Sequence, residues 1–179
     1  MKKALILGIS GQDGYYLTKE LLDSNYKVFG MVRRHSVSNN QTTRINSLIN
    51  EIELEYGDLL DANSVRNIFK KIKPDVIFNL AAMSQVKISN IMPSFTIQTN
   101  GLAVLNILEI IKESLSSAVF YQASSSEMFG NSVDKDKFQR LTTPMNPVSP
   151  YGCSKLLAYH LVKHYRNAYK LNLRNGILF

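Results

Sequence analysis

Short apolar runs along the chain alternate with longer stretches in which apolar residues recur at helical spacing. The apolar runs predict strands at Lys3–Leu7, Lys27–Val32, Glu53–Tyr56, Asp75–Leu80, Ala118–Ala123 and Asn175–Phe179. The helical spacing predicts helices over Asn63–Lys71, Phe95–Ser114 and Ser149–Tyr169, and another around Leu17, Leu21 and Leu22. Asp61 is a candidate N-cap of the Asn63–Lys71 helix, and Pro74 ends it.

This alternation predicts an α/β fold, a Rossmann-like doubly wound parallel sheet with helices on both faces. The run Val76–Phe78 suits a strand that is buried on both sides. The length of 179 residues predicts one domain, residues 1–179. Two polar segments, 34–46 and 131–147, are expected to be long loops.

The composition is typical of a soluble globular protein, with 45% hydrophobic and 20% charged residues. The apolar start of the chain is too short for a signal peptide, and no apolar run suggests a membrane span. Cys153 is the single cysteine, so no internal disulfide is expected and a cytoplasmic location is the default. His160 and His164 lack the partners of a metal motif, and no metal site is predicted.

The chain is basic, with 21 Lys and Arg against 14 Asp and Glu and a formal net charge of +7. Its basic clusters are short and stand beside no recognisable nucleic-acid-binding motif, so no nucleic-acid partner is predicted. Ligands that carry phosphate account for the charge more economically.

A glycine-rich segment follows the first predicted strand. Gly8, Gly11 and Gly14 have the spacing G-x-x-G-x-x-G, which differs from the usual dinucleotide-binding fingerprint. Such a segment can be a plain strand-to-helix turn, but its place before the first helix favours a pyrophosphate site. The expected cofactor contacts in this segment are Gly8, Ser10, Gly11, Gln12, Asp13 and Gly14.

The ends of the next strands supply further candidates. Arg33 and Arg34 stand where an NAD-binding protein usually has an acidic residue, with Ser36 close by. Arginine suits a 2′-phosphate, so NADP is favoured over NAD, although a pair of solvated surface arginines is the alternative. The remaining candidates follow the third and fourth strands: Asp58, Leu59, Leu80, Ala81, Ala82 and Ser84.

The sharpest chemical signal is Tyr151 and Lys155, four residues apart on one helix face. A nearby ammonium is expected to lower the pKa of the phenol, so that Tyr151 can act as an acid or a base. A packed aromatic ring beside a surface lysine is the alternative. The downstream position, after five predicted strands, favours the catalytic interpretation.

Ser125 and Glu127 follow the fifth strand and share a face if that strand continues. The hydroxyl can bond a substrate oxygen beside Tyr151. A carboxylate is unnecessary for hydride transfer alone, but removal of a proton from carbon requires a base. A surface residue at a strand end is the alternative for Glu127.

These motifs together resemble the extended short-chain dehydrogenase/reductase superfamily and, more narrowly, the GDP-mannose 4,6-dehydratases. The similarity runs nearly the whole length of the chain. It is carried by Gly8–Gly14, Met31–Arg34, Tyr56–Leu59, Asn79–Ser89, Phe120–Gly130, Ser149–Tyr151 and Asn175–Phe179.

The resemblance implies an enzyme, a hydro-lyase that converts GDP-mannose to its 4-keto-6-deoxy product with bound NADP. Tyr151 would deprotonate the C4 hydroxyl and Lys155 would hold the nicotinamide ribose. Glu127 would take the C5 proton and Ser125 would bond the C4 oxygen. The resemblance also implies a homo-oligomer, a dimer or a tetramer, with segment 34–46 as a subunit contact.

The sequence departs from the family pattern at three places. Ser125 replaces the usual threonine but keeps the hydroxyl, and Met83 and Gln85 replace the more frequent Gln and His. Family members also continue past the match to Phe179 into a smaller substrate domain, so the chain is expected to be an N-terminal portion that largely lacks it. A reductase or epimerase of the same superfamily, or a non-catalytic NADP-binding module, is the alternative function.

Overall fold

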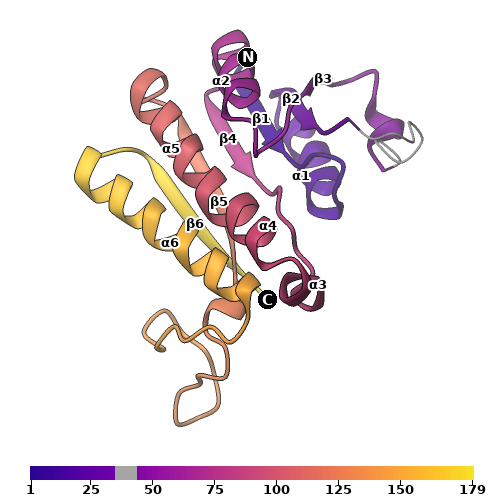
Figure 1. Cartoon of the computed structure of the whole chain (residues 1–179). Coiled ribbons are helices and arrows are strands. Elements are labelled where there is room, and N and C mark those ends of the chain that lie inside the picture. Colours follow the sequence, from indigo (N-terminus) through magenta and orange to yellow (C-terminus); the bar gives the residue numbers. More distant parts are fainter. Residues whose placement is uncertain (35–43) are drawn as a thin grey trace.

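A computed structural model describes residues 1–34 and 44–179 of the chain. Six parallel strands form one sheet: β1 (Lys3–Leu7), β2 (Lys27–Val32), β3 (Glu53–Tyr56), β4 (Val76–Asn79), β5 (Val119–Ser125) and β6 (Leu173–Leu178). Their order is β3-β2-β1-β4-β5-β6, as Figure 1 shows. The direction of winding therefore reverses between β1 and β4, where Ala4 pairs with Val76. The prediction of a Rossmann-like parallel sheet is confirmed.

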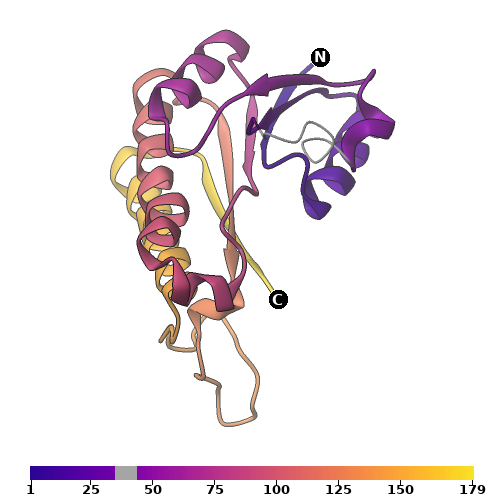
Figure 2. The ribbon, with the colours of Figure 1, turned by 45° about the vertical axis from the view of Figure 1, so that its right-hand side comes forward.

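Helices cover the two faces of this sheet unequally. The helices are α1 (Gln12–Asp23), α2 (Ala62–Ile72), α3 (Val86–Ile91), α4 (Pro93–Ile97), α5 (Ala103–Ser114) and α6 (Pro150–Tyr169). In Figure 2, α2, α5 and α6 lie along one face, whereas α1 lies on the other, over the half of the sheet that holds β1 and β2. No described helix covers β4 and β5 on that second face, where Phe78 and Tyr121 stay partly exposed.

The larger core lies between the sheet and the helices α2, α5 and α6. It includes Leu5, Ile77 and Phe120 from the strands and Ile107 and Val162 from the helices, all 1% exposed or less. Within the described residues, Pro93–Ser114 is the one helical stretch that has the length and composition of a membrane span, and 56% of its apolar window is buried inside the protein. The apolar character of this stretch is therefore that of a core helix.

The predicted helix Phe95–Ser114 is wrong in detail. The structure begins it at Pro93 and interrupts it with a π-helical turn over Gln98–Leu102, between α4 and α5. The strand β5 runs to Ser125, two residues beyond the prediction, and α3 was not predicted. The Asp61 cap is confirmed, because its carboxylate accepts hydrogen bonds from the amides of Asn63 and Ser64 at the start of α2.

Between β5 and α6, the loop 131–147 projects from the body of the molecule (Figure 1). Arg140 organises it by forming ion pairs of 2.9 Å with Asp134 and 2.6 Å with Asp136. Thr143 adds a 2.8 Å hydrogen bond from its hydroxyl to Asp134. Contacts within the loop 131–147 therefore stabilise the conformation of this loop.

Candidate active site

The turn between β1 and α1 forms the floor of a cavity. Gly8 has φ +88°, and a Cβ there would lie 2.8 Å from the amide nitrogen of Ala81. A side chain at this position would therefore push apart β1 and the segment that follows β4. Gly11 is the N-cap of α1 and has no side chain, so it gives the first amides of α1 no side-chain cap. Such amides are suited to bind an anion.

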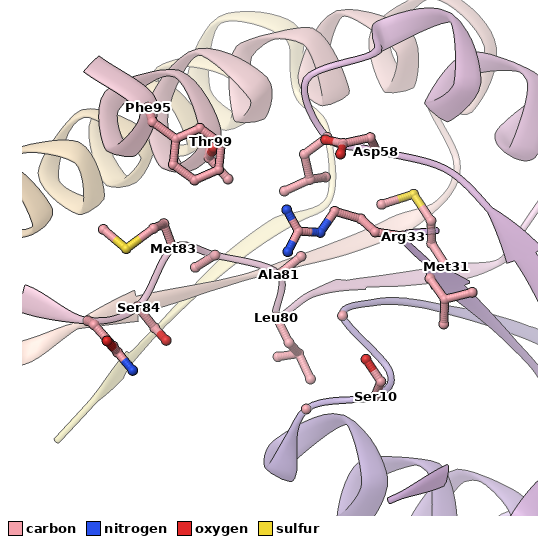
Figure 3. A pocket seen from close by; sticks show the side chains of 16 residues that line it. Ser10, Met31, Arg33, Asp58, Leu80, Ala81, Met83, Ser84, Phe95 and Thr99 are labelled. Atoms are coloured by element: carbon pink, nitrogen blue, oxygen red, sulfur yellow. The ribbon is translucent and has the colours of Figure 1, made fainter. Parts of the chain in front are cut away.

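The cavity holds about 440 Å³ at the carboxyl ends of β1, β2 and β4, the point where the winding of the sheet reverses (Figure 3). Ligands of open α/β sheets bind at such switch points. Its walls consist of Gly8, Ser10, Gly11, Met31, Val32, Arg33, Asp58, Leu59, Leu80, Ala81, Ala82, Met83, Ser84, Gln85, Phe95 and Thr99. The small residues leave room for a flat ligand, and the glycine turn offers backbone donors.

Most of the predicted cofactor contacts line this cavity: Gly8, Ser10, Gly11, Arg33, Asp58, Leu59, Leu80, Ala81, Ala82 and Ser84. Gln12, Asp13, Gly14, Arg34, Tyr151 and Lys155, also predicted as cofactor contacts, do not line it, and Ser36 lies outside the described residues. Figure 3 shows the Arg33 side chain extending over the cavity towards Ala81. The two adjacent arginines thus differ in position, since only Arg33 contributes to the cavity wall.

Six of the lining residues were not predicted as contacts from the sequence: Met31, Val32, Met83, Gln85, Phe95 and Thr99. Phe95 and Thr99 come from α4 and the π turn, where helical periodicity predicts helix interior rather than a ligand wall. The Thr99 hydroxyl is buried without a hydrogen-bond partner among the described residues. A buried polar atom in a cavity wall is available to a ligand.

Four other side chains form a second cluster, where α6 begins. Tyr151 and Lys155 are 8% and 4% exposed, and the Lys155 ammonium lies 5.7 Å from the centre of the Tyr151 ring. Lys155 Nζ donates a 2.9 Å hydrogen bond to the carbonyl of Ala123 in β5. Ser125 ends the same strand, and its Oγ accepts a 3.2 Å hydrogen bond from the amide of Glu127. The structure therefore brings Ser125, Glu127, Tyr151 and Lys155 together.

The strand does not continue to Glu127, so Ser125 and Glu127 do not share a strand face, which the sequence had made conditional on that continuation. The strand β5 ends at Ser125, and Glu127 lies in a 3₁₀ turn over Ser126–Met128 that Ser125 caps. This turn approaches α6 so closely that a Cβ on Gly152 would lie 2.6 Å from the Glu127 carbonyl. The carboxylate thus reaches the cluster through a tight turn packed on α6.

The first turn of α6 is held by side chains from two directions. The Ser149 hydroxyl caps the helix by accepting a 3.0 Å hydrogen bond from the amide of Gly152. The amide of Tyr151 donates a 3.2 Å hydrogen bond to Ser89 in α3. Because these amides would otherwise lack partners, both serines fix the direction in which α6 leaves the loop.

Burial dominates the ionisation of this cluster. It raises the pKa of Tyr151, an effect that the Ser125 hydroxyl opposes and the Glu127 carboxylate reinforces. Burial also lowers the pKa of Lys155 to about 8. The expectation that Lys155 lowers the pKa of Tyr151 is wrong for this arrangement, because the ammonium bonds to Ala123 and the phenolate loses its hydration.

Comparisons with known proteins place the chain among relatives of one kind. The family model described as GDP-mannose 4,6 dehydratase matches residues 5–179. A GDP-mannose 4,6 dehydratase from Cricetulus griseus is 44% identical over 99% of this chain and 50% of its own length.

Solved structures of sugar-nucleotide enzymes share the fold. A UDP-Glc/GlcNAc 4-epimerase from Campylobacter jejuni has a TM-score of 0.85 at 22% identity and matches 99% of this chain and 52% of its own. A dTDP-glucose 4,6-dehydratase from Bacillus anthracis, solved in complex with NAD, has a TM-score of 0.82 at 22% identity. The match covers 99% of this chain and 54% of the chain of that dehydratase. The chain thus spans about half the length of the relatives it matches.

Proposed function

Because the chain belongs to the GDP-mannose 4,6-dehydratase family, we propose that the protein is a hydro-lyase that converts GDP-mannose to GDP-4-keto-6-deoxymannose. The observation that carries this proposal is the grouping of Glu127 with Ser125, Tyr151 and Lys155 where α6 begins. A dehydratase needs a base for the carbon-bound C5 proton in addition to the group that handles the C4 hydroxyl.

The cofactor that we propose is NADP. The glycine turn provides a cradle that a Cβ would fill, and the Thr99 hydroxyl in the cavity wall has no hydrogen-bond partner in the described part of the chain. At the end of β2, the guanidinium of Arg33 offers several N–H donors that can bind a 2′-phosphate. Asp58 and the small residues Ala81 and Ala82 would line the adenosine end. When bound, the nicotinamide supplies an acceptor for the C4 hydride and then a donor to C6.

The residues of the chain divide the proton transfers between them. Tyr151 takes the proton of the C4 hydroxyl, while Ser125 bonds the C4 oxygen. Glu127 takes the proton from C5 and passes it to the C6 hydroxyl, which leaves as water. C5 regains a proton when C6 is reduced, and the proton that Tyr151 took from the C4 hydroxyl balances it, so that one water is lost in total. Since the pKa of Tyr151 is raised in this structure, its phenolate must be stabilised in the loaded site, where Lys155 on the same helix face is the available cation.

We also propose where the enzyme acts and how it assembles. It would act in the cytoplasm as a homo-oligomer, a dimer or a tetramer, on a nucleotide sugar. About half the length of the relatives has no counterpart in this chain. The chain by itself is therefore proposed to bind cofactor, whereas full activity is proposed for the full-length protein.

The test incubates the full-length protein with GDP-mannose and catalytic NADP⁺ and follows the loss of one water by mass spectrometry. Glu127→Gln and Tyr151→Phe are expected to reduce the rate about 100- to 10,000-fold, the range of acid–base catalysis. Tyr159→Phe, a half-buried tyrosine on the same helix, is the control and should retain the rate. If the wild type binds NADP⁺ but releases no water, the dehydratase proposal fails, and a reductase, an epimerase or a non-catalytic binder takes its place.

A further inference from the structure

The strands β4 and β5 part just before the catalytic cluster, and the carbonyl of Ala123 lies where they part. The pairing of β4 with β5 ends at Asn79 and Gln122. Backbone groups along β5 face its two neighbours alternately, and the amide of Val119 donates to Asp75 on the side of β4. Four residues later, the Ala123 carbonyl faces the same side, beyond the last pair. The ladder between β4 and β5 therefore stops short of this carbonyl.

Two buried side chains donate to the Ala123 carbonyl in place of a strand. Lys155 Nζ donates a 2.9 Å hydrogen bond to it, and Gln122 Nε2 donates one of 3.1 Å. A carbonyl oxygen has two lone pairs, so both are used here. Lys155 is 4% exposed and Gln122 is 1% exposed. The ammonium of the catalytic cluster is thus held by a carbonyl whose second donor is Gln122.

Asn79 fixes the orientation of the Gln122 amide. Its Nδ2 donates a 2.8 Å hydrogen bond to Gln122 Oε1, and the two residues are partners across β4 and β5. Because the oxygen of the Gln122 amide is bound to Asn79, the nitrogen end is directed to Ala123. A buried chain of hydrogen bonds therefore runs from β4 through Gln122 to the carbonyl that holds Lys155.

This pair of amides does not favour folding. Asn79 is 1% exposed, and its Oδ1 has no hydrogen-bond partner among residues 1–34 and 44–179. A buried acceptor without a partner lowers stability, whereas two apolar side chains of the same shape would avoid the loss. Departures from such packing rules are expected at functional sites. The two amides therefore point to a role in the site rather than in the stability of the sheet.

We propose that Gln122 is a positioning residue for Lys155, because its amide fixes the Ala123 carbonyl that holds the ammonium 5.7 Å from the centre of the Tyr151 ring. This inference rests on the proposed function, in which Lys155 serves the nicotinamide end of the dinucleotide and the phenolate of Tyr151. Gln122 does not line the cavity and acts through Ala123. Without its amide, the carbonyl and the ammonium can move together, away from the reacting groups.

Dinucleotide binding to the full-length protein tests the proposal without turnover. Gln122→Met keeps the volume of the side chain but removes the amide. It should weaken NADP⁺ about tenfold, the value of one hydrogen bond to a charged group. Adenosine 2′,5′-bisphosphate, the adenosine half alone, should bind as it does to the wild type, because Lys155 does not line the cavity proposed for that half. Calorimetric titration measures both affinities, and equal weakening of both ligands, or of neither, would overturn the proposal.

Ser124→Ala is the matched control. Ser124 lies two residues from Gln122 on the same face of β5 and is 2% exposed. Its hydroxyl donates a 3.2 Å hydrogen bond to Asn175 Oδ1 in β6, so its loss leaves the Ala123 carbonyl in place. The control should lower the melting temperature and leave the ratio of the two affinities unchanged. If Ser124→Ala alters that ratio as much as Gln122→Met, any defect in β5 has the effect and the proposal fails.

A double variant separates positioning from stability. Asn79→Leu combined with Gln122→Met replaces both amides by apolar groups of similar shape and removes the unpartnered oxygen of Asn79. The melting temperature should therefore equal or exceed that of the wild type, whereas NADP⁺ should be weakened as in Gln122→Met. A folded double variant with the wild-type affinity for NADP⁺ would contradict the proposal.

Turnover gives a second readout. In Gln122→Met, kcat for water loss from GDP-mannose is expected to fall about 10- to 100-fold, because a displaced catalytic group loses rate steeply. Ser124→Ala should retain the rate, and a wild-type kcat in Gln122→Met would overturn the inference. If the wild type binds NADP⁺ but releases no water, the proposed function fails, while the ratio of the two affinities still decides the role of Gln122.

Discussion

At the scale of single residues, the burial of the Lys155 ammonium in the site destabilises the folded protein. The ordinary pKa of 10.5 falls to about 8 because the ammonium is buried. Below that pH the charged lysine opposes folding, and the penalty disappears as the pH rises through the window between the two values. Its carbonyl partner, Ala123, also accepts a 3.1 Å hydrogen bond from Gln122 and would keep a donor without the lysine.

We therefore expect Lys155→Met to stabilise the protein while it abolishes activity. At pH 7 the free energy of unfolding should rise by up to about 3 kcal/mol, since each pKa unit corresponds to about 1.4 kcal/mol. The gain should shrink as the pH is raised above 8. Urea unfolding at several pH values measures it, with the exposed Lys163→Met as the control. A Lys155→Met variant less stable than the wild type at pH 7 would contradict the burial argument.

Arg33 and Arg34 provide a second residue-scale prediction. Only Arg33 lines the cavity, so Arg33→Ala should weaken NADP⁺ about 10- to 100-fold, the value of a charge-assisted hydrogen bond. NAD⁺, which lacks the 2′-phosphate, should lose far less. Titration with both dinucleotides measures the ratio, and Arg34→Ala is the matched control. Equal weakening of both dinucleotides by Arg33→Ala would show that the arginine does not read the 2′-phosphate.

Sequence reasoning could identify site residues that belong to local motifs. The glycines after β1 and the Tyr151–Lys155 pair have fixed spacings, which the structure turns into one turn and one helix face. Phe95 and Thr99 could not be found in this way, because the π turn and tertiary packing place them in the cavity wall. The pKa of Tyr151 was misjudged for a related reason, since burial depends on the whole fold.

At the scale of elements, the glycines of the turn between β1 and α1 have different structural roles. A Cβ on Gly14 would lie 2.6 Å from the carbonyl oxygens of Gly8 and Ile9, whereas one on Gly11 would meet only the Gly8 oxygen, at 3.3 Å. Gly14 therefore serves the packing of α1 against the turn. Gly11, in contrast, borders the cavity.

Gly14→Ala is accordingly expected to destabilise the fold by about 1–3 kcal/mol, the usual cost of overpacking. Gly11→Ala should preserve the melting temperature but weaken dinucleotide binding, because its methyl group enters the ligand space. Thermal unfolding and cofactor titration of both variants separate the two effects. Equal loss of stability in both would show that the turn responds as one unit.

The elements themselves were largely predictable, with errors that have physical causes. Periodicity located α1, α2, α5 and α6 but missed the short α3. The π turn leaves the apolar pattern of Phe95–Ser114 intact, so the sequence gives no sign of it. The strand β5 reaches Ser125 because Ser125 pairs with Leu178 of β6, a partner more than fifty residues away. Strand ends of this kind depend on neighbours that the local sequence does not contain.

At the scale of the whole molecule, the described residues of this chain enclose a cavity of about 440 Å³ at the switch point of the sheet. We expect the 179-residue chain alone to bind NADP⁺ and to gain about 2.7 kcal/mol of stability at a concentration 100 times the Kd. Thermal unfolding at increasing NADP⁺ measures the shift, with Arg33→Ala as the variant of weaker response. An unchanged melting temperature at saturating NADP⁺ would show that the cavity needs further parts.

The sheet order has a kinetic consequence for this cavity. The strands β1 and β4 are neighbours although about seventy residues separate Ala4 from Val76, and chains dominated by such distant pairings fold slowly. The unit from β1 to α2 and the unit from β4 to β6 each contain their own helices and can form early. Binding competence arises only when the two units join, so recovery of the dinucleotide site should be the last event of refolding, after the helical signal has returned.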